Sequence, residues 1–354
     1  MDRAQKSKDS IIEEEMWRQA QHILTAIAQK SEAFNPAVYS DRAAMPQARI
    51  AILIPCYNEE LTIAKVVRDF REQLPQAEMY VFDNNSTDHT ADQAQKAGAH
   101  VAHERRQGKG FVVQAMFQQV DADVYVLVDG DDTYPASEVH KLIAPVLEGK
   151  AEMVVGSRLM PSSESDFRLL NKAGNGFFLR LINSIFKVKL SDVLSGYRAF
   201  SREFVKSIPV FGGGFETEVE LTVKALARGY RIVEIPVRLT ARPEGSFSKI
   251  RIVQDGFVIL NTILSLVRDY KPLTFFGGMG LVLMILGFIP GIVVIVEFIK
   301  TGLVPRLPSA VLAVGLVLSG MLLLVVGLVL HTITRRFQEL EHQLRLRGNE
   351  PTKP

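Results

Sequence analysis

Two long apolar stretches near the end of the chain constrain its fold more than any other feature. Residues 273–299 contain one charged residue, Glu297, and residues 308–333 contain one ionisable residue, His331. About 20 helical residues, each rising ~1.5 Å, cross the ~30 Å hydrocarbon core of a bilayer. Both stretches are long enough, and their short linker predicts a transmembrane helical hairpin. A pair of buried helices in a soluble domain is the alternative, but such cores rarely contain two successive runs of this kind.

Basic residues flank this pair of stretches on both sides. Arg268 and Lys271 precede it, Arg335 and Arg336 follow it, and the linker carries only two cations. Because basic flanks stay in the cytoplasm, both ends of the hairpin are expected there. The sequence therefore predicts a multi-pass protein of the cytoplasmic (inner) membrane, with the large domain that precedes the hairpin in the cytoplasm.

The composition excludes several other classes of protein. The chain has 41 Lys and Arg against 39 Asp and Glu, so a broad basic face for nucleic acid is not expected. A single cysteine, Cys56, excludes an internal disulfide and a cysteine-based zinc site. It also fits a reducing compartment. The polar and acidic N-terminus is unlike a signal peptide.

From residue 49 onward, short apolar strands alternate with helical patterns. The expected strands are residues 50–55, 79–83, 100–103, 124–129 and 153–156, and the expected helices are residues 60–73, 88–97 and 109–120. This rhythm predicts an α/β fold in which a mostly parallel, Rossmann-like sheet has helices on both faces. Ligands bind such sheets beyond the carboxyl ends of the strands, so the polar residues that follow the strands belong to one rim.

The predicted organisation has five parts. Residues 1–48 form a helical extension and linker, 49–249 the catalytic domain, 250–271 a juxtamembrane amphipathic helix, 272–334 two transmembrane helices and 335–354 a cytoplasmic tail. Segments 177–188 and 250–270 are amphipathic helices that either face the core or lie in the headgroup plane. The second, with an apolar stripe through Phe257, Leu260 and Leu264, runs into the first span, which favours the interfacial position. Gly287 and Gly291 permit close helix packing, either inside the hairpin or in a homo-oligomer.

Three carboxylates follow the predicted strand 124–129, namely Asp129, Asp131 and Asp132. Crowded carboxylates repel one another and usually need a cation. Oxygen ligands without thiols or histidines predict Mg²⁺ or Mn²⁺, with substrate phosphates completing the coordination shell. A solvated acidic turn is the alternative.

A second polar turn, residues 83–88, follows another strand. Ser86, Thr87 and Asp88 are good helix caps, which leaves Asp83 and Asn84 for the edge of a base. Residues 108–110 (Gly-Lys-Gly) open a helix, and Lys109 at that helix end suits an anion, although a plain turn explains the same residues. There is no P-loop and no GxGxxG after the first strand, which argues against a dinucleotide-dependent oxidoreductase.

Seven short motifs occur in order along the chain: PCYNE at 55–59, DNNSTD at 83–88, GKG at 108–110, DGD at 129–131, GSR at 156–158, SGYR at 195–198 and RPEGSFSK at 242–249. Together they resemble the family 2 glycosyltransferases of GT-A fold. In particular, they resemble the polyprenyl-phosphate group that includes dolichol-phosphate mannose synthase and bactoprenol glucosyltransferases. The resemblance covers about residues 49–268, and two C-terminal spans fit the bactoprenol-type members.

The resemblance implies roles for individual residues. The donor-binding residues would be Pro55, Tyr57, Glu59, Asp83, Asn84, Lys109 and Asp129. Asp129 and Asp131 would hold the metal on the donor diphosphate, with Asp132 as a further candidate ligand. The catalytic set would be Asp131, Arg158, Arg198, Arg242 and Lys249, and the acceptor phosphate would meet Arg198, Arg242, Ser248 and Lys249.

The implied reaction moves one sugar from a nucleotide-sugar, expected to be a UDP-sugar, to a polyprenyl phosphate in the membrane. That phosphate is already ionised, so the reaction needs cations rather than a strong base, and in-line attack inverts the anomeric carbon. Glu216, Glu218 and Glu220 then have a sugar-binding or structural role, or form an exposed helix face.

Two alternative functions remain open at this stage. One is transfer to a lipid-linked sugar hydroxyl or polysaccharide synthesis, although the only tryptophan is Trp17 and the QxxRW motif is absent. The other is a non-catalytic nucleotide-sugar-binding scaffold.

Overall fold

The core of the protein is a seven-stranded sheet. The computed structural model describes residues 48–159, 166–211, 213–214, 216–240 and 252–348. The strands are β1 (Ile50–Cys56), β2 (Glu78–Asp83), β3 (His100–His103), β4 (Val124–Leu127), β5 (Met153–Leu159), β6 (Arg198–Ser201) and β7 (Ile232–Arg238). Their order is β3-β2-β1-β4-β6-β5-β7, and β6 alone runs antiparallel to its two neighbours.

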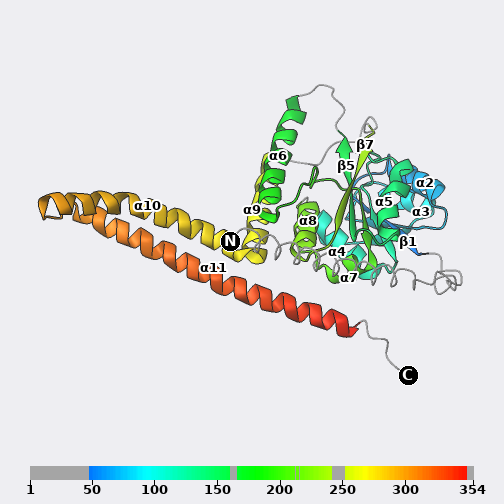
Figure 1. The fold of residues 1–354 in the computed structure, drawn as a ribbon. Helices are drawn as coiled ribbons and strands as arrows, with labels where there is room; N and C mark the ends of the chain where they lie inside the picture. Colours follow the sequence, from blue (N-terminus) through cyan, green and yellow to red (C-terminus); the bar gives the residue numbers. More distant parts are fainter. Residues whose placement is uncertain (1–47, 160–165, 212, 215, 241–251, 349–354) are drawn as a thin grey trace, which may run out of the picture. The chain divides into compact units, whose positions relative to one another are not determined.

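Both faces of the sheet are covered by helices (Figure 1). In β1, Ile50, Ile52 and Ile54 face one apolar cluster, while Ala51 and Leu53 face another. This alternation is the period-2 geometry of a strand that is buried on both sides. The first cluster lies under α2 (Ile63–Gln73), α3 (Thr90–Lys96) and α5 (Val139–Leu147). The second lies under α4 (Lys109–Gln119), α7 (Arg202–Ser207) and α8 (Thr217–Ala227).

The mostly parallel sheet is confirmed, with two strands that the pattern did not predict. β6 has only four residues and opens with Arg198, and β7 contains Glu234 and Pro236, so neither reads as an apolar run. β4 ends at Leu127, two residues earlier than expected. Val128 still donates its backbone N–H to the Leu53 carbonyl at 3.0 Å, so the acidic residues begin directly at the sheet edge.

A third apolar cluster lies outside the sheet layers. It joins α6 (Asp166–Phe186), α8 and α9 (Ile252–Tyr270) through residues that include Ile182, Val219 and Ile263. Two residues of the predicted apolar stripe of α9, Phe257 and Leu264, are 73% and 41% exposed, so they do not face the core. The buried face of α9 instead carries Ile259, Ile263, Leu266 and Val267.

The two apolar stretches form α10 (Pro272–Thr301) and α11 (Leu307–Gly348), each long and apolar enough to cross a membrane. Their backbones meet at Gly280 and Gly320, where a Cβ on either residue would lie about 2.5 Å from the other's carbonyl oxygen (2.5 and 2.6 Å). A Cβ on Gly287 would lie 2.9 Å from the Ala313 carbonyl, so this glycine serves the hairpin. α11 continues as one helix to Gly348, through most of the segment expected as a separate tail. Residues 1–47 of the expected helical extension and linker lie outside the described residues.

Candidate active site

Three strand ends build the rim of the site. The loops after β1 and β2 interlock: Asn58 donates its backbone N–H to Ser86 Oγ at 2.9 Å, and Glu59 donates its own to Thr90 Oγ1 at 2.8 Å. Asn58, Asn85 and Asp132, in the loops after β1, β2 and β4, have φ values of 52°, 62° and 58°. Asn and Asp tolerate this left-handed conformation better than other non-glycine residues, which explains these residue types at sharp turns.

Asp83, the last residue of β2, is buried at the rim. Its Oδ2 accepts the backbone N–H of Ser86 at 3.2 Å and lies 3.3 Å from His103 Nδ1. Its Oδ1 is buried and has no hydrogen-bond partner within the described part of the chain. A buried carboxylate oxygen without a donor is costly, so this atom is a candidate acceptor for a ligand N–H.

Asn84 is held differently from the prediction that it is free to meet a base. Its amide nitrogen donates to the carbonyls of Glu104 and Arg106 at 2.9 and 2.8 Å. Its amide oxygen accepts the backbone N–H of Gly108 at 2.7 Å. These contacts fix the loop between β3 and α4. If Asn84 contributes to binding of the nucleotide-sugar, it would therefore do so by holding this loop in place.

The remaining predicted donor-binding residues of this region lie at the end of β1 and directly after it. Pro55 is half-buried within the strand, and Tyr57 is exposed directly after it. Glu59 accepts a contact from Thr62 Oγ1, which also donates to the carbonyl of Gly130 at 2.6 Å. The loops after β1 and β4 are thereby joined, and the predicted donor residues share one rim.

The most strongly charged part of the site centres on Lys109. Its Nζ lies 2.6 Å from Asp129 Oδ1 and 2.5 Å from Glu218 Oε1. Burial by itself lowers the pKa of Lys109, but the two carboxylates outweigh burial and raise this pKa above its ordinary value. Burial raises the pKa of the Asp129 carboxyl, Lys109 opposes that rise, and the charges of Asp131 and Glu218 add to it. Lys109 therefore stays protonated and positively charged between Asp129 and Glu218.

The helix end that carries Lys109 is not an open anion cradle. Gly108 has φ 135°, and a Cβ there would lie 1.7 Å from the Gly213 carbonyl oxygen. The chain before α8 thus packs directly onto the first turn of α4. Any anion bound at this end would meet Lys109 rather than a free helix terminus.

The acidic residues after β4 do not form one three-residue cluster. Asp131 is buried, and its Oδ1 accepts the backbone N–H and the hydroxyl of Thr133 at 3.2 and 2.6 Å. Asp132 instead pairs with Lys65 Nζ at 2.9 Å. No group of three metal-ligating side chains is found among the residues that the structure describes. Asp132 therefore faces Lys65 of α2, apart from the predicted metal ligands Asp129 and Asp131.

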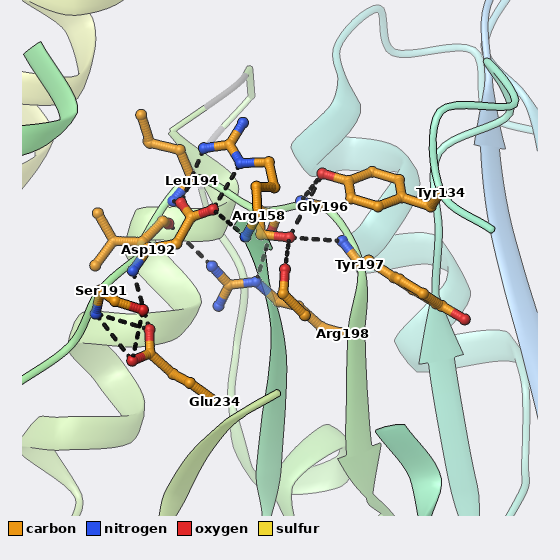
Figure 2. A network of polar contacts seen from close by, with 12 residues as sticks. Tyr134, Arg158, Ser191, Asp192, Leu194, Gly196, Tyr197, Arg198 and Glu234 are labelled. Atoms are coloured by element: carbon orange, nitrogen blue, oxygen red, sulfur yellow. Dashed lines mark hydrogen bonds and ion pairs between the residues drawn. The ribbon is translucent and has the colours of Figure 1, made fainter. Parts of the chain in front are cut away.

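Gly196 lies against Asp129. A Cβ at this position would be 2.4 Å from Asp129 Oδ2, so only glycine leaves the carboxylate where it is. The backbone N–H of Gly196 donates to the Tyr134 hydroxyl at 3.0 Å, which fixes the peptide (Figure 2).

Arg158 is held by a carboxylate that the motifs did not point to. Its Nε and Nη2 donate to the two oxygens of Asp192 at 2.6 and 2.8 Å (Figure 2). Burial lowers the pKa of Arg158, but the Asp192 carboxylate outweighs burial and raises it. Asp192 donates its backbone N–H to Glu234 at 2.9 Å, so β7 also supports the pair. Bidentate pairs of this kind fix the guanidinium plane.

Arg198 does not reach the site surface. It is 0% exposed, and its nitrogens donate to the carbonyls of Ser195 and Val193 and to Thr222 Oγ1 at 2.8 to 2.9 Å. Burial lowers its pKa. The prediction that Arg198 binds the acceptor phosphate is not supported by this placement, because the guanidinium supports the loop before β6 instead.

The three glutamates at the start of α8 are all buried, so the alternative of an exposed helix face is wrong. Glu216 Oε1 accepts the backbone N–H groups of Gly213 and Gly214 at 2.9 and 3.0 Å. Glu220 Oε1 accepts from Lys224 Nζ at 2.5 Å and from the Phe211 backbone N–H at 2.9 Å. With Glu218 on Lys109, each of the three glutamates contacts a cation or a backbone donor.

The predicted acceptor residues Arg242, Ser248 and Lys249 lie outside the described residues. The last described residue before them, Thr240, donates its backbone N–H to the Thr133 carbonyl at 3.0 Å. Its hydroxyl donates to the Asp132 carbonyl at 2.7 Å. The chain therefore leaves for this segment from the acidic loop and resumes in α9.

Sequence reasoning missed Asp192, Glu234 and Gly196. The only signal for Asp192 was an acid six residues before Arg198, and nothing local showed that it would face Arg158 on another strand. Glu234 belongs to a strand that the pattern did not reveal.

The mostly parallel seven-stranded sheet with helices on both faces belongs to the GT-A fold class. One similar solved structure is the glucosyl-3-phosphoglycerate synthase of Mycobacterium tuberculosis in complex with Mg²⁺ and UDP. It aligns over 62% of this chain and 79% of that chain, with a TM-score of 0.52 and 22% identity. At that identity the likeness concerns the fold alone.

Sequence comparison gives the family. The glycosyl transferase family 2 model matches residues 51–208. Glycosyltransferase AglJ of Haloferax volcanii is 32% identical over 300 residues, which are 82% of this chain and 98% of that protein. The chain therefore belongs to glycosyl transferase family 2 and is a glycosyltransferase. A dolichyl-phosphate hexose transferase of the same organism is 32% identical over 188 residues, 53% of this chain and 81% of that protein.

Proposed function

We propose that this enzyme transfers one sugar from a UDP-sugar to a polyprenyl phosphate at the cytoplasmic surface of the membrane, with inversion and with a divalent cation. The observation that carries the proposal is the pairing of all three α8 glutamates inside the protein. A hydroxyl acceptor needs a base at this place, whereas an ionised lipid phosphate does not. This contrast favours the phosphate acceptor over the sugar-hydroxyl alternative.

The donor proposal rests on Asp83. One of its carboxylate oxygens is occupied by Ser86 and His103, and the other is buried without a donor among the described residues. One available oxygen suits a base edge with one N–H, as in uracil, better than the two adjacent N–H groups of guanine. The neighbouring-fold synthase solved with UDP is consistent with this choice.

The cation proposal rests on the donor set at the end of β4. Asp129 and Glu218 both lie against the buried ammonium of Lys109, and the charge of Asp131 also acts on Asp129, which leaves an excess of negative charge. Mg²⁺ and Mn²⁺ are usually held by one or two carboxylates and by substrate phosphates, so Asp129 and Asp131 fit this role. Such a cation, when bound, supplies positive charge to the departing diphosphate.

The protein's own residues have the remaining tasks. Lys109 holds Asp129 in place, and Arg158, fixed by Asp192, presents a guanidinium for the approaching phosphates. The segment with Arg242, Ser248 and Lys249 connects the acidic loop to α9. We assign the lipid phosphate to this segment because α9 continues into α10, which has the length and composition of a membrane span.

A matrix assay tests this function. Membranes containing the full chain are incubated with UDP- or GDP-sugars and short polyprenyl phosphates, and the products are analysed by mass spectrometry. We expect one monoglycosylated polyprenyl phosphate that disappears with a chelator and returns with Mn²⁺. Asp131→Asn should abolish it, and Asp92→Asn, on the exposed side of α3, is the matched control.

The alternatives predict different products. Glycosylation of a lipid-linked sugar, without glycosylation of the lipid phosphate, would favour the sugar-hydroxyl acceptor. UDP binding without any transfer would favour a non-catalytic scaffold. Near-normal transfer by Asp131→Asn with Mn²⁺ present would remove the acidic pair from the mechanism.

A further inference from the structure

The proposed reaction steps assign no direct task to the Glu218 carboxylate. It lies in the first turn of α8, is 3% exposed, and its Oε1 is 2.5 Å from Lys109 Nζ. Lys109 in turn lies 2.6 Å from Asp129 Oδ1. The buried ammonium of Lys109, in α4, is therefore shared between Asp129, a candidate metal ligand, and Glu218 of α8.

The sharing determines how much positive charge Asp129 feels. With Glu218 ionised, Lys109 is divided between two carboxylates, and Asp129 and Asp131 keep enough negative charge to attract a cation. Without that charge, Lys109 would pair with Asp129 alone and compete with any metal ion there. At these separations and in a largely buried site, the Coulomb interaction is strong enough to change a binding constant.

We propose that Glu218 is a positioning residue that sets the divalent-cation affinity of Asp129 and Asp131 by sharing Lys109 with Asp129. This inference rests on the proposed metal-dependent function. It adds that α8, through one side chain, controls the charge of the donor site. The competing explanation is a buried ion network that serves only stability, in which removing any member harms the fold.

Charge-changing variants separate these explanations. The probe is Mn²⁺, titrated by electron paramagnetic resonance into the full chain in detergent with saturating UDP. Glu218→Gln should weaken Mn²⁺ binding by about tenfold, because it removes one negative charge from the site. Lys109→Met should tighten it by a similar factor, since it removes the competing cation. The double variant has the wild-type net charge at the site and should return to within about threefold of wild type.

The controls address folding. Glu220→Gln lies on the same helix, is equally buried and pairs with Lys224 rather than Lys109, so its Mn²⁺ affinity should stay within about threefold. Thermal unfolding of each variant identifies the folded fraction. Glu218→Asp keeps the charge, so it should retain Mn²⁺ affinity within about threefold even if Glu218→Gln does not fold.

The outcomes differ for the inference and for the function on which it rests. Opposite shifts in the single variants, reversed in the double variant, support the inference. Weaker binding in all three variants, or no change in Glu218→Gln, overturns it while leaving the metal site in place. Wild-type protein that binds no Mn²⁺ in the presence of UDP would refute the metal-dependent function and this inference with it.

Discussion

At the scale of single residues, Gly196 determines where Asp129 can lie. The Asp129 carboxylate has Lys109 on one oxygen and Gly196 against the other. No side chain fits at position 196, because a Cβ on Gly196 would be 2.4 Å from Asp129 Oδ2. A change at Gly196 therefore acts on the acidic pair without removing a charge.

We predict that Gly196→Ala lowers transfer at least about tenfold, since displacing a group by ~1 Å can cost about 100-fold in rate. The variant should still fold, because only the carboxylate has to move. Transfer activity and the unfolding temperature in detergent measure the two effects. Gly176→Ala, where a Cβ meets no heavy atom within 4 Å, is the matched control. Normal transfer by Gly196→Ala would show that Asp129 is not held in a required position.

Arg198 provides the opposite case, a charged residue whose role is structural. It is fully buried, and its partners are two carbonyls and a hydroxyl rather than a carboxylate. We predict that Arg198→Ala destabilises the protein by about 3 kcal/mol or more, because it leaves buried acceptors unpaired and opens a cavity. The shift of the unfolding temperature measures this loss. An unchanged unfolding temperature together with a specific loss of acceptor-dependent transfer would restore the predicted phosphate-binding role.

At the scale of elements, the segment between β7 and α9 connects the acidic loop to the helix that leads into α10. It begins after Thr240, which is bound to the acidic loop, and it ends at α9, which leads into α10. A lipid phosphate lies at headgroup depth, so its cationic partners belong near that surface. Arg242 and Lys249 are the cations of this segment that the resemblance assigned to the acceptor.

We predict that Arg242→Ala and Lys249→Ala each reduce transfer by more than about 100-fold, while UDP affinity changes only a few-fold. A charge pair that strengthens in the transition state is worth ~3 kcal/mol or more. A contact with anionic lipid is worth only ~1 kcal/mol per cation. Transfer kinetics and calorimetry of UDP separate the two. Mild effects on transfer, or an equal loss of UDP affinity, would move the acceptor site elsewhere, with Arg158 the strongest remaining candidate.

The elements also show which parts could be predicted from sequence. The strands 50–55, 79–83 and 100–103 were found because apolar runs with turns on either side are local signals. β6 and β7 were missed because their pairing with β5 supplies what their own residues lack. Asp129 and Lys109 were identified as site residues from their own motifs. Their pairing, and the presence of Glu218, depend on three elements meeting in space, which no local pattern encodes.

At the scale of the whole molecule, α8 links the site to α9, the helix that precedes the apolar helices α10 and α11. One side of α8 carries Glu218 on Lys109, and another carries Val219 and Val223 in the apolar cluster shared with α9. Because α9 packs on α8 and leads directly into α10, the catalytic domain and the hairpin are joined by side-chain packing as well as by the chain.

The hairpin topology gives the last prediction. Both flanks of α10 and α11 are basic, so we expect the loop between the helices on the outside of the cell. Gly302 ends α10 with φ 68°, so a cysteine there would be strained, whereas Val304 is 43% exposed and suitable. The native Cys56 is buried, so it should not react with the labelling reagent.

Val304→Cys should react with a membrane-impermeant maleimide in intact cells. Asp92→Cys, on the exposed side of α3, should react only after the cells are permeabilised. Equal protection of both positions in intact cells would contradict the hairpin, because the helices would then not place their loop across the membrane from the catalytic domain.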